Sequence, residues 1–158
     1  MATPDLAALL ETTWFAAHLT LPARQRLAAL GRLAEFPAGA VVLREGEPCE
    51  ALGVVVDGLV AIRLRLPGGD DRTILTIHAG DVYGWSAVLP QAIATSTVVA
   101  VQPTRAVTFE RDDLRQALAS DCDLAAAVYA RLLASVARRL SATRFQLLDL
   151  YKPGAQSW

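Results

Sequence analysis

The stretch "GDVYGWSAVLPQAIATSTV", residues 80–98, has the pattern of a turn and a short helix inserted between two β-strands. The first N–H groups of a helix have no partner within the helix, so an insertion of this kind can bind an anion. However, no Arg, Lys or carboxylate lies between Val82 and Val98. The stretch therefore predicts a loop shaped to cradle an anion but without the charges that would hold one.

The segments around this loop have the composition of short strands. From residue 36 to 110 the chain is rich in valine and is punctuated by glycines, as in "LGVVVDGLVAIRLRL" and "RTILTIHAG". The sequence "LPGGDD", between two of these runs, is typical of a hairpin turn. Short strands separated by regular turn signals predict an antiparallel jelly roll over residues 36–110.

Helices are predicted on both sides of the roll, and residues 1–158 are predicted to form one domain. Residues 4–34 carry leucines at helical spacing, with Thr20 as a cap and Pro22 in the first turn of a second helix. After residue 112 a short helix is followed by a long one, from about residue 123 to 151. Asp121 or Asp123 can cap the start of the long helix, and "KPG" ends it.

The composition bears on the class of protein. The chain has 158 residues, 53% of them hydrophobic, and a net charge of −1, which gives no general attraction to nucleic acid or to anionic membranes. No apolar run approaches the ~20 residues of a membrane helix, and the N-terminus lacks the basic start of a secretory signal. We therefore expect a cytoplasmic protein in which Cys49 and Cys122 are reduced thiols.

The two histidines of the chain are the candidates for catalysis or metal binding. His18 and His78 have no carboxylate partner at helical or strand spacing, so neither a metal site nor a catalytic triad is predicted. We expect the protein not to be an enzyme.

The long helix carries an apolar pattern of its own. Apolar residues alternate by three and four positions, interrupted by Thr143, as in a coiled-coil seam. These residues are Leu133, Val136, Leu140, Leu147 and Leu150. We expect them to form the seam of a homodimer; the alternative is a helix that packs on its own domain.

Four segments in this order carry a family resemblance: "FPAGAVVLREGEP", "LGVVVDGLVAI", "HAGDVYGWSAVL" and "STVVAVQPTRAVTFERDDL". The chain resembles the cyclic-nucleotide-binding domain family, the sensory half of regulators similar to the catabolite activator protein, over about residues 14–150. Regulators of this family carry a winged helix-turn-helix after the long helix, whereas only "KPGAQSW" follows it here. The resemblance thus implies a stand-alone sensor module without direct DNA binding, which acts through a separate effector protein.

The resemblance also implies a ligand site, because residues 84–97 fall where the family keeps its phosphate-binding cassette. There a Glu holds the ribose hydroxyl, backbone N–H groups approach the cyclic phosphate, and an Arg pairs with it. Here Trp85 occupies the Glu position, and the Arg position falls on Ala94, or on Ile93 if the gap is placed differently. A charge-assisted hydrogen bond is worth ~1.5–3 kcal/mol, so we expect that cyclic AMP is not bound in the usual way. The implied cassette residues are Gly84, Trp85, Ser86, Ala87, Thr95, Ser96 and Thr97.

Three functions follow as hypotheses. The first is a sensor with an altered cassette, in which Trp85 fills the pocket. The second is a true cyclic-nucleotide receptor, in which Trp85 stacks on the base and the backbone holds the phosphate. Such stacking is worth ~1–3 kcal/mol. The third is a ligand-free dimeric scaffold that recruits a protein partner. No cofactor is expected, other than a cyclic nucleotide or another small anionic ligand. In the family the long helix reaches over the pocket, and the candidates to cover a ligand from one helical face are Arg131, Ser135 and Arg138.

Overall fold

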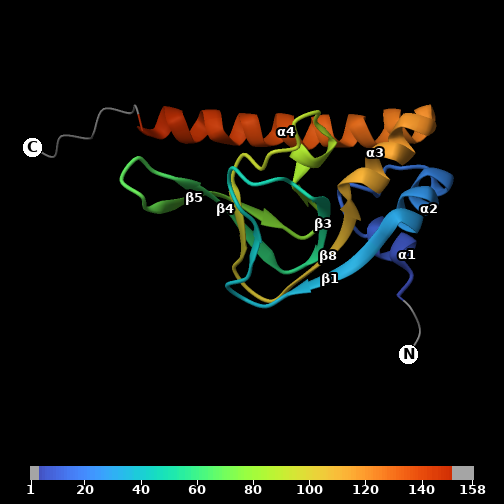
Figure 1. The fold of residues 1–158 in the computed structure, drawn as a ribbon, viewed down its shortest axis with the longest axis horizontal. Helices are drawn as coiled ribbons and strands as arrows, with labels where there is room; N and C mark the ends of the chain where they lie inside the picture. Colours follow the sequence, from blue (N-terminus) through green and yellow to red (C-terminus); the bar gives the residue numbers. More distant parts are fainter. Residues whose placement is uncertain (1–3, 151–158) are drawn as a thin grey trace, which may run out of the picture.

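A computed structural model describes residues 4–150 as two four-stranded antiparallel sheets flanked by helices (Figure 1). The strand order is β1-β8-β3-β6 in one sheet and β2-β7-β4-β5 in the other. The jelly roll expected from the glycine-punctuated strands is thereby confirmed. The strands are β1 Gly31–Phe36, β2 Val41–Leu43, β3 Ala51–Asp57, β4 Leu59–Arg65, β5 Asp71–His78, β6 Val82–Tyr83, β7 Thr97–Ala100 and β8 Thr104–Glu110.

The apolar residues form two cores. One core lies inside the roll, where Val60, Ile77, Val98 and Tyr83 pack together. The other lies between the first sheet and the helices and is the larger of the two. Its fully buried members come from both the sheet and the helices, and include Leu10, Leu27, Leu52, Val107, Phe109, Leu114 and Val128. Since burying one such side chain contributes about 1.5–3 kcal/mol, this second core fixes the helices on the roll.

The N-terminal helices are α1, Leu6–Glu11, and α2, Leu21–Leu30. Thr20 caps α2 as expected, accepting a hydrogen bond from the Ala23 N–H at 3.4 Å, with a proline in the first turn. The prediction of helix up to residue 34 is wrong, because β1 starts at Gly31 and pairs with β8 along its whole length. A Cβ at Gly31 would come within 2.8 Å of the Val107 side chain, so the chain turns into the sheet where no side chain obstructs it.

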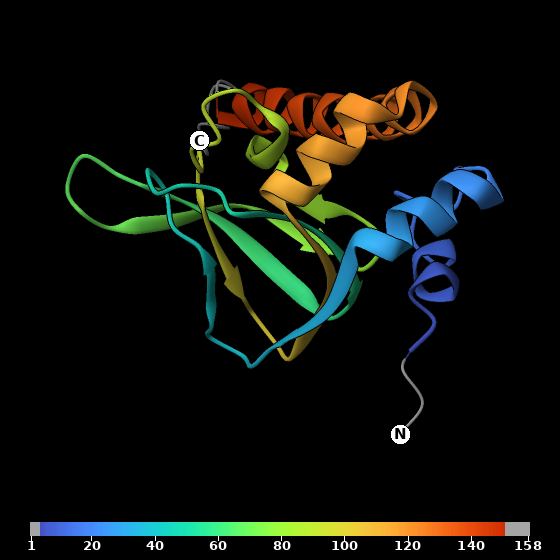
Figure 2. The same ribbon diagram turned by 45° about the vertical axis from the view of Figure 1, so that its right-hand side comes forward.

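The C-terminal helices are α3, Arg111–Ser120, and α4, Cys122–Leu150. Asp121 caps the start of α4, as expected, by accepting the Leu124 N–H at 3.0 Å. Figure 2 shows α3 running from the end of β8 back to the start of α4. Figure 1 shows α4 crossing the roll from the N-terminal helices toward the β4–β5 hairpin, where Gln146 donates to the Ile74 carbonyl at 3.3 Å. The predicted end of this helix at "KPG" lies outside the described residues.

Candidate ligand-binding site

The loop between β6 and β7 begins with the expected turn and short helix. Gly84 has a φ of 72°, and a Cβ there would come within 2.4 Å of the Ala51 carbonyl oxygen, so only glycine fits without strain. The helix that follows, η1, spans Trp85–Val88 as a single 3-10 turn. Its Ala87 N–H donates to the Gly84 carbonyl at 3.0 Å. This turn therefore offers fewer N–H groups to an anion than the predicted α-helix start would.

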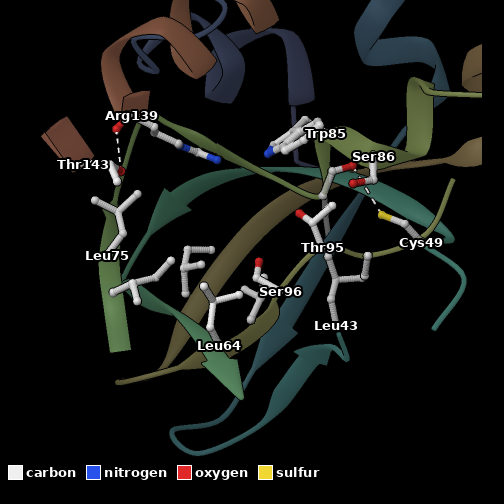
Figure 3. Close-up of a pocket in the computed structure, with 15 residues that line it drawn as sticks. Leu43, Cys49, Leu64, Leu75, Trp85, Ser86, Thr95, Ser96, Arg139 and Thr143 are labelled. Atoms are coloured by element: carbon white, nitrogen blue, oxygen red, sulfur yellow. Dashed lines mark hydrogen bonds between the residues drawn. The ribbon is translucent and has the colours of Figure 1, made fainter. Parts of the chain in front are cut away.

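A pocket of about 280 Å³ lies between this loop, the inner surface of the second sheet and α4 (Figure 3). Small-ligand pockets typically span ~300–1,000 Å³, so this one is at the small end of the range. The strands β2, β4, β5 and β7 supply an aliphatic wall, made of Leu43, Ile62, Leu64, Ile74, Leu75 and Val98. The loop supplies Gly84, Trp85, Ser86, Ala94, Thr95 and Ser96, and the remaining lining residues are Cys49, Arg139 and Thr143.

Most of the predicted cassette residues line this pocket, but two do not. Its lining includes Gly84, Trp85, Ser86, Thr95 and Ser96. Ala87 instead lies fully buried in the larger core. The Thr97 hydroxyl accepts the Glu45 N–H at 3.1 Å, in a different depression on the outer side of the sheet.

Trp85 forms a wall of the pocket. Its half-buried indole packs against the larger core, and Figure 3 shows the ring beside Ser86 at one end of the cavity. The pocket therefore has free volume beside the indole, in a position where the ring can both support the core and face a ligand. Filling and stacking stay as alternative roles for this side chain.

The predicted ligand-covering residues on α4 lie elsewhere. Arg131 and Arg138 flank the ring of Trp14, with guanidinium carbons 4.2 and 4.1 Å from its centroid. Arg131 also donates to the Trp14 carbonyl at 2.6 Å. The Ser135 hydroxyl is buried and donates to an Asp81 carboxylate oxygen at 2.7 Å. In this structure all three residues fasten α4 to the rest of the protein and none lines the pocket.

The residues of α4 that do line the pocket are Arg139 and Thr143, which the sequence analysis did not select as ligand contacts. Both lie on the helical face of Ser135, at successive spacings of four residues. The four-residue spacing from Ser135 is the sequence signal that could have identified both residues as lining the pocket. Thr143, which interrupts the apolar seam pattern, points toward the pocket wall, and its hydroxyl donates to the Arg139 carbonyl at 2.9 Å (Figure 3).

Arg139 carries the only charge among the described residues that line the pocket. Its side chain is 15% exposed and lies 3.6 Å from an Asp81 carboxylate oxygen. One terminal nitrogen donates to the Val82 carbonyl, whereas the buried Nε has no hydrogen-bond partner. Burial lowers the pKa of this guanidinium, against the opposing effect of Asp81.

The predicted seam lies on a part of α4 that the roll leaves open. Leu133 is 70% exposed, and Leu140 and Leu147 are each 50% exposed. Val136 is half-buried, and the side chain of Leu150 lies outside the described part of the structure. Most of the described seam residues are therefore accessible to a second helix.

Metal ligands, membrane-spanning helices and reactive thiols are the other features that would indicate a function. No three His, Cys, Asp or Glu side chains in residues 4–150 come together as metal ligands, and none of the described helices is long and apolar enough to cross a membrane. The buried Cys49 thiol donates to the Gly84 carbonyl at 3.4 Å, and burial raises its pKa. A thiol with a raised pKa is a poor nucleophile, so Cys49 acts as a packing residue beside the loop.

The sequence is similar to that of known regulatory proteins. The family profile described as "Cyclic nucleotide-binding domain" matches residues 33–121. The CRP-like cAMP-activated global transcriptional regulator of Mycobacterium tuberculosis is 32% identical over 116 residues, covering 73% of this chain and 50% of that protein. The cAMP-dependent protein kinase regulatory subunit of Dictyostelium discoideum is 27% identical over 105 residues, covering 65% of this chain and 32% of that protein. The chain thus spans half or less of the length of these relatives.

Solved structures share the fold at low sequence identity. A cyclic nucleotide-binding domain from Methylobacillus flagellatus superimposes with a TM-score of 0.79 and 21% identity, covering 95% of this chain and 84% of that one. The catabolite activator protein of Thermus thermophilus gives a TM-score of 0.71 and 22% identity, covering 87% of this chain and 63% of that one. With the profile match over more than half of its residues, the chain belongs to the cyclic nucleotide-binding domain family.

Proposed function

We propose that this regulatory domain is a non-enzymatic sensor module with an altered cassette, which does not bind cyclic AMP in the family's usual way. The observation that carries the proposal is the loop itself. Trp85 stands at the expected Glu position, and Ala94, which lines the pocket and is 4% exposed, stands at the expected Arg position. Neither side chain carries the carboxylate or the guanidinium with which the family's cassette holds the ribose hydroxyl and the phosphate. The missing Arg alone weakens binding by roughly 10- to 150-fold.

The output of the sensor is proposed to pass through α4. Arg139 and Thr143 place one face of this helix in the wall of the pocket. A ligand that contacts them therefore has a different affinity for different positions of α4, and this difference is all that a population shift requires.

A homodimer through α4 is part of the same proposal. Leu133, Leu140 and Leu147 lie at seven-residue spacing and are at least half exposed. Apolar residues at this spacing on a helix pair with a second helix in the manner of a coiled coil. A dimer formed in this way would bring each pocket close to the partner's helix.

Calorimetric titration with cyclic AMP and cyclic GMP tests the proposal. We expect dissociation constants in the millimolar range or no measurable heat, and micromolar or tighter binding by the natural sequence would contradict the proposal. The double variant Trp85→Glu/Ala94→Arg restores both charges and should bind cyclic AMP at least about 100-fold more tightly, since it adds one ribose and one phosphate contact of at least about 1.5 kcal/mol each. The matched control Trp85→Glu/Ile93→Arg places the Arg on a residue that is 44% exposed, and should gain less.

A cyclic-nucleotide receptor that uses stacking is the second candidate, favoured by the position of Trp85 in the wall together with the hydroxyls of Ser86, Thr95 and Ser96. The variant Trp85→Ala separates the two functions. A stacking residue loses cyclic-nucleotide affinity by roughly 5- to 150-fold with little change in stability. A filling residue loses stability while the affinity for cyclic nucleotides does not change.

A further inference from the structure

Arg139 has donor capacity that the protein leaves unused. A guanidinium offers five N–H donors, but a single hydrogen bond from the Arg139 side chain is present, to the Val82 carbonyl. Its Nε is buried without a partner. The nearby Asp81 oxygen already accepts the Ser135 hydroxyl at 2.7 Å and the Val82 N–H at 2.8 Å, and Arg139 lies farther from it, at 3.6 Å.

Arg139 lines a pocket whose other described lining residues carry no charge. Figure 3 shows the Arg139 side chain extending from α4 toward Trp85, above Thr95 and Ser96. None of the described residues in the lining is a carboxylate. Asp81, 3.6 Å from Arg139, is the nearest carboxylate among the described residues and is not part of the lining. A ligand with one negative charge can therefore still use Arg139, whereas a second negative charge would have no partner.

The rest of the lining is mainly apolar. Six aliphatic side chains from the strands and the indole of Trp85 line the space, together with a few hydroxyl groups. Apolar walls with a few placed polar groups select a ligand with an apolar body, and an indole face favours a flat one. The sugar of a nucleotide, with its hydroxyl groups, is poorly matched to such walls.

We infer that the pocket takes a small monoanion with a planar apolar body, for which Arg139 on α4 holds the anionic group; this rests on the proposed sensor function. The cassette has lost its charges, and the long helix supplies the cation in their place. An anion at Arg139 joins α4 to the roll through the ligand, so that binding strengthens the hold of this helix on the pocket. The hydroxyl of Ser96 also lines the pocket and can act as a further donor to the anion.

The test compares 2-naphthoate with its uncharged counterpart 2-naphthamide, which has the same ring system. Calorimetry and the quenching of tryptophan fluorescence measure both affinities for the natural sequence, Arg139→Gln and Arg138→Gln. We expect the natural sequence to bind the carboxylate about tenfold to a hundredfold more tightly than the amide, as for a charge-assisted hydrogen bond. Arg139→Gln should abolish this preference. Arg138→Gln, a change on the ring of Trp14 outside the pocket, should preserve it.

Each other result overturns the inference. Equal binding of the two probes, no binding of either one up to millimolar concentration, or an equal loss of preference in both variants excludes Arg139 as the anion-binding residue. Because removal of Arg139 can also affect folding, melting curves accompany every variant, and Arg139→Lys keeps the charge and should keep a reduced preference. Weak cyclic AMP binding combined with equal naphthyl affinities rejects this inference alone. Tight cyclic AMP binding rejects the proposed function itself.

Discussion

Ser135→Ala tests whether the buried contact between α4 and the roll holds the helix in place. Ser135 is 1% exposed, and its hydroxyl donates to Asp81 at 2.7 Å. The Asp81 side chain is itself 18% exposed, so water replaces the lost donor poorly. Hydrogen bonds to charged groups are worth about 1.5–3 kcal/mol. We expect Ser135→Ala to lower the free energy of unfolding by this amount.

Urea unfolding at neutral pH measures this free energy for the natural sequence, Ser135→Ala, Asp81→Asn and the double variant. The double-mutant cycle should give a coupling energy of about 1–3 kcal/mol, as for residues in direct contact. Hydrogen exchange locates the effect, because α4 should lose protection while β8 keeps it until global unfolding. Ser120→Ala is the matched control. Ser120 is an exposed serine of α3 that bonds only to its own helix, and its removal should change stability by less than about 0.5 kcal/mol.

Two results would contradict this prediction. One is a loss of unfolding free energy from Ser135→Ala as small as that from Ser120→Ala, and the other is that the losses from Ser135→Ala and Asp81→Asn simply add. Additive effects would mean that the two side chains do not share a contact in solution. An affinity change for the naphthyl probes without a stability change would instead assign Ser135 to the ligand, as the sequence analysis expected.

Three further predictions concern the loop, the inner core and the seam. Gly84→Ala should cost more than about 1 kcal/mol, since it combines a strained φ with a close approach to a backbone oxygen; a melting curve checks this, and an unchanged melting temperature would contradict it. Burial raises the pKa of Tyr83, whose hydroxyl has no partner. The unfolded chain therefore loses the tyrosine proton first, and the free energy of unfolding should fall as the pH rises above the ordinary tyrosine pKa of about 10. Tyr83→Phe should be neutral or stabilising and should reduce that alkaline loss in urea titrations; an identical pH profile would count against it. In sedimentation velocity, Leu133→Asp/Leu140→Asp should convert a dimer to a monomer. The control Phe145→Asp should not, because Phe145 is 69% exposed and lies off the seam. A natural protein that is already monomeric rules out the seam.

Local chemistry made much of the fold predictable from sequence. Thr20 and Asp121 cap helices where a side-chain oxygen beside a helical pattern predicts it. Glycine turns separate the strands in the expected order, and Gly84 takes a positive φ within the predicted loop. These features depend on residues within a few positions of one another, which a sequence displays directly.

The errors arise where distant segments decide. Leu33 continues the helical spacing of Leu27 and Leu30, yet it pairs with Val107 in the sheet. The register between β1 and β8 joins residues 68 to 78 positions apart, from Phe36↔Thr104 to Gly31↔Phe109, and no local pattern contains it. The strand pairing therefore overrides the helical periodicity.

The same cause explains why the sequence pattern selected Arg138 and not Arg139 on α4. Adjacent residues on a helix differ by about 100° in direction, so the change from Arg138 to Arg139 turns a side chain from Trp14 to the pocket. The rotation of α4 about its axis is set by Trp14 and Asp81, which belong to other parts of the chain. A sequence can indicate that this helix covers the pocket, but the covering face follows only from these contacts.

This division of faces gives the proposed sensor a way to keep its coupling without charges in the cassette. Ser135 and Arg139 hold one face of α4 against the roll, while Leu133 and Leu140 lie on the face that the roll leaves open. Because both faces belong to one continuous helix, Cys122–Leu150, a change in the position of Arg139 would also move the exposed leucines. The coupling thus depends on a ligand that contacts α4, and the cassette need not carry the charge. In the proposed function, the residue that binds the ligand and the helix that transmits the signal are joined at Arg139.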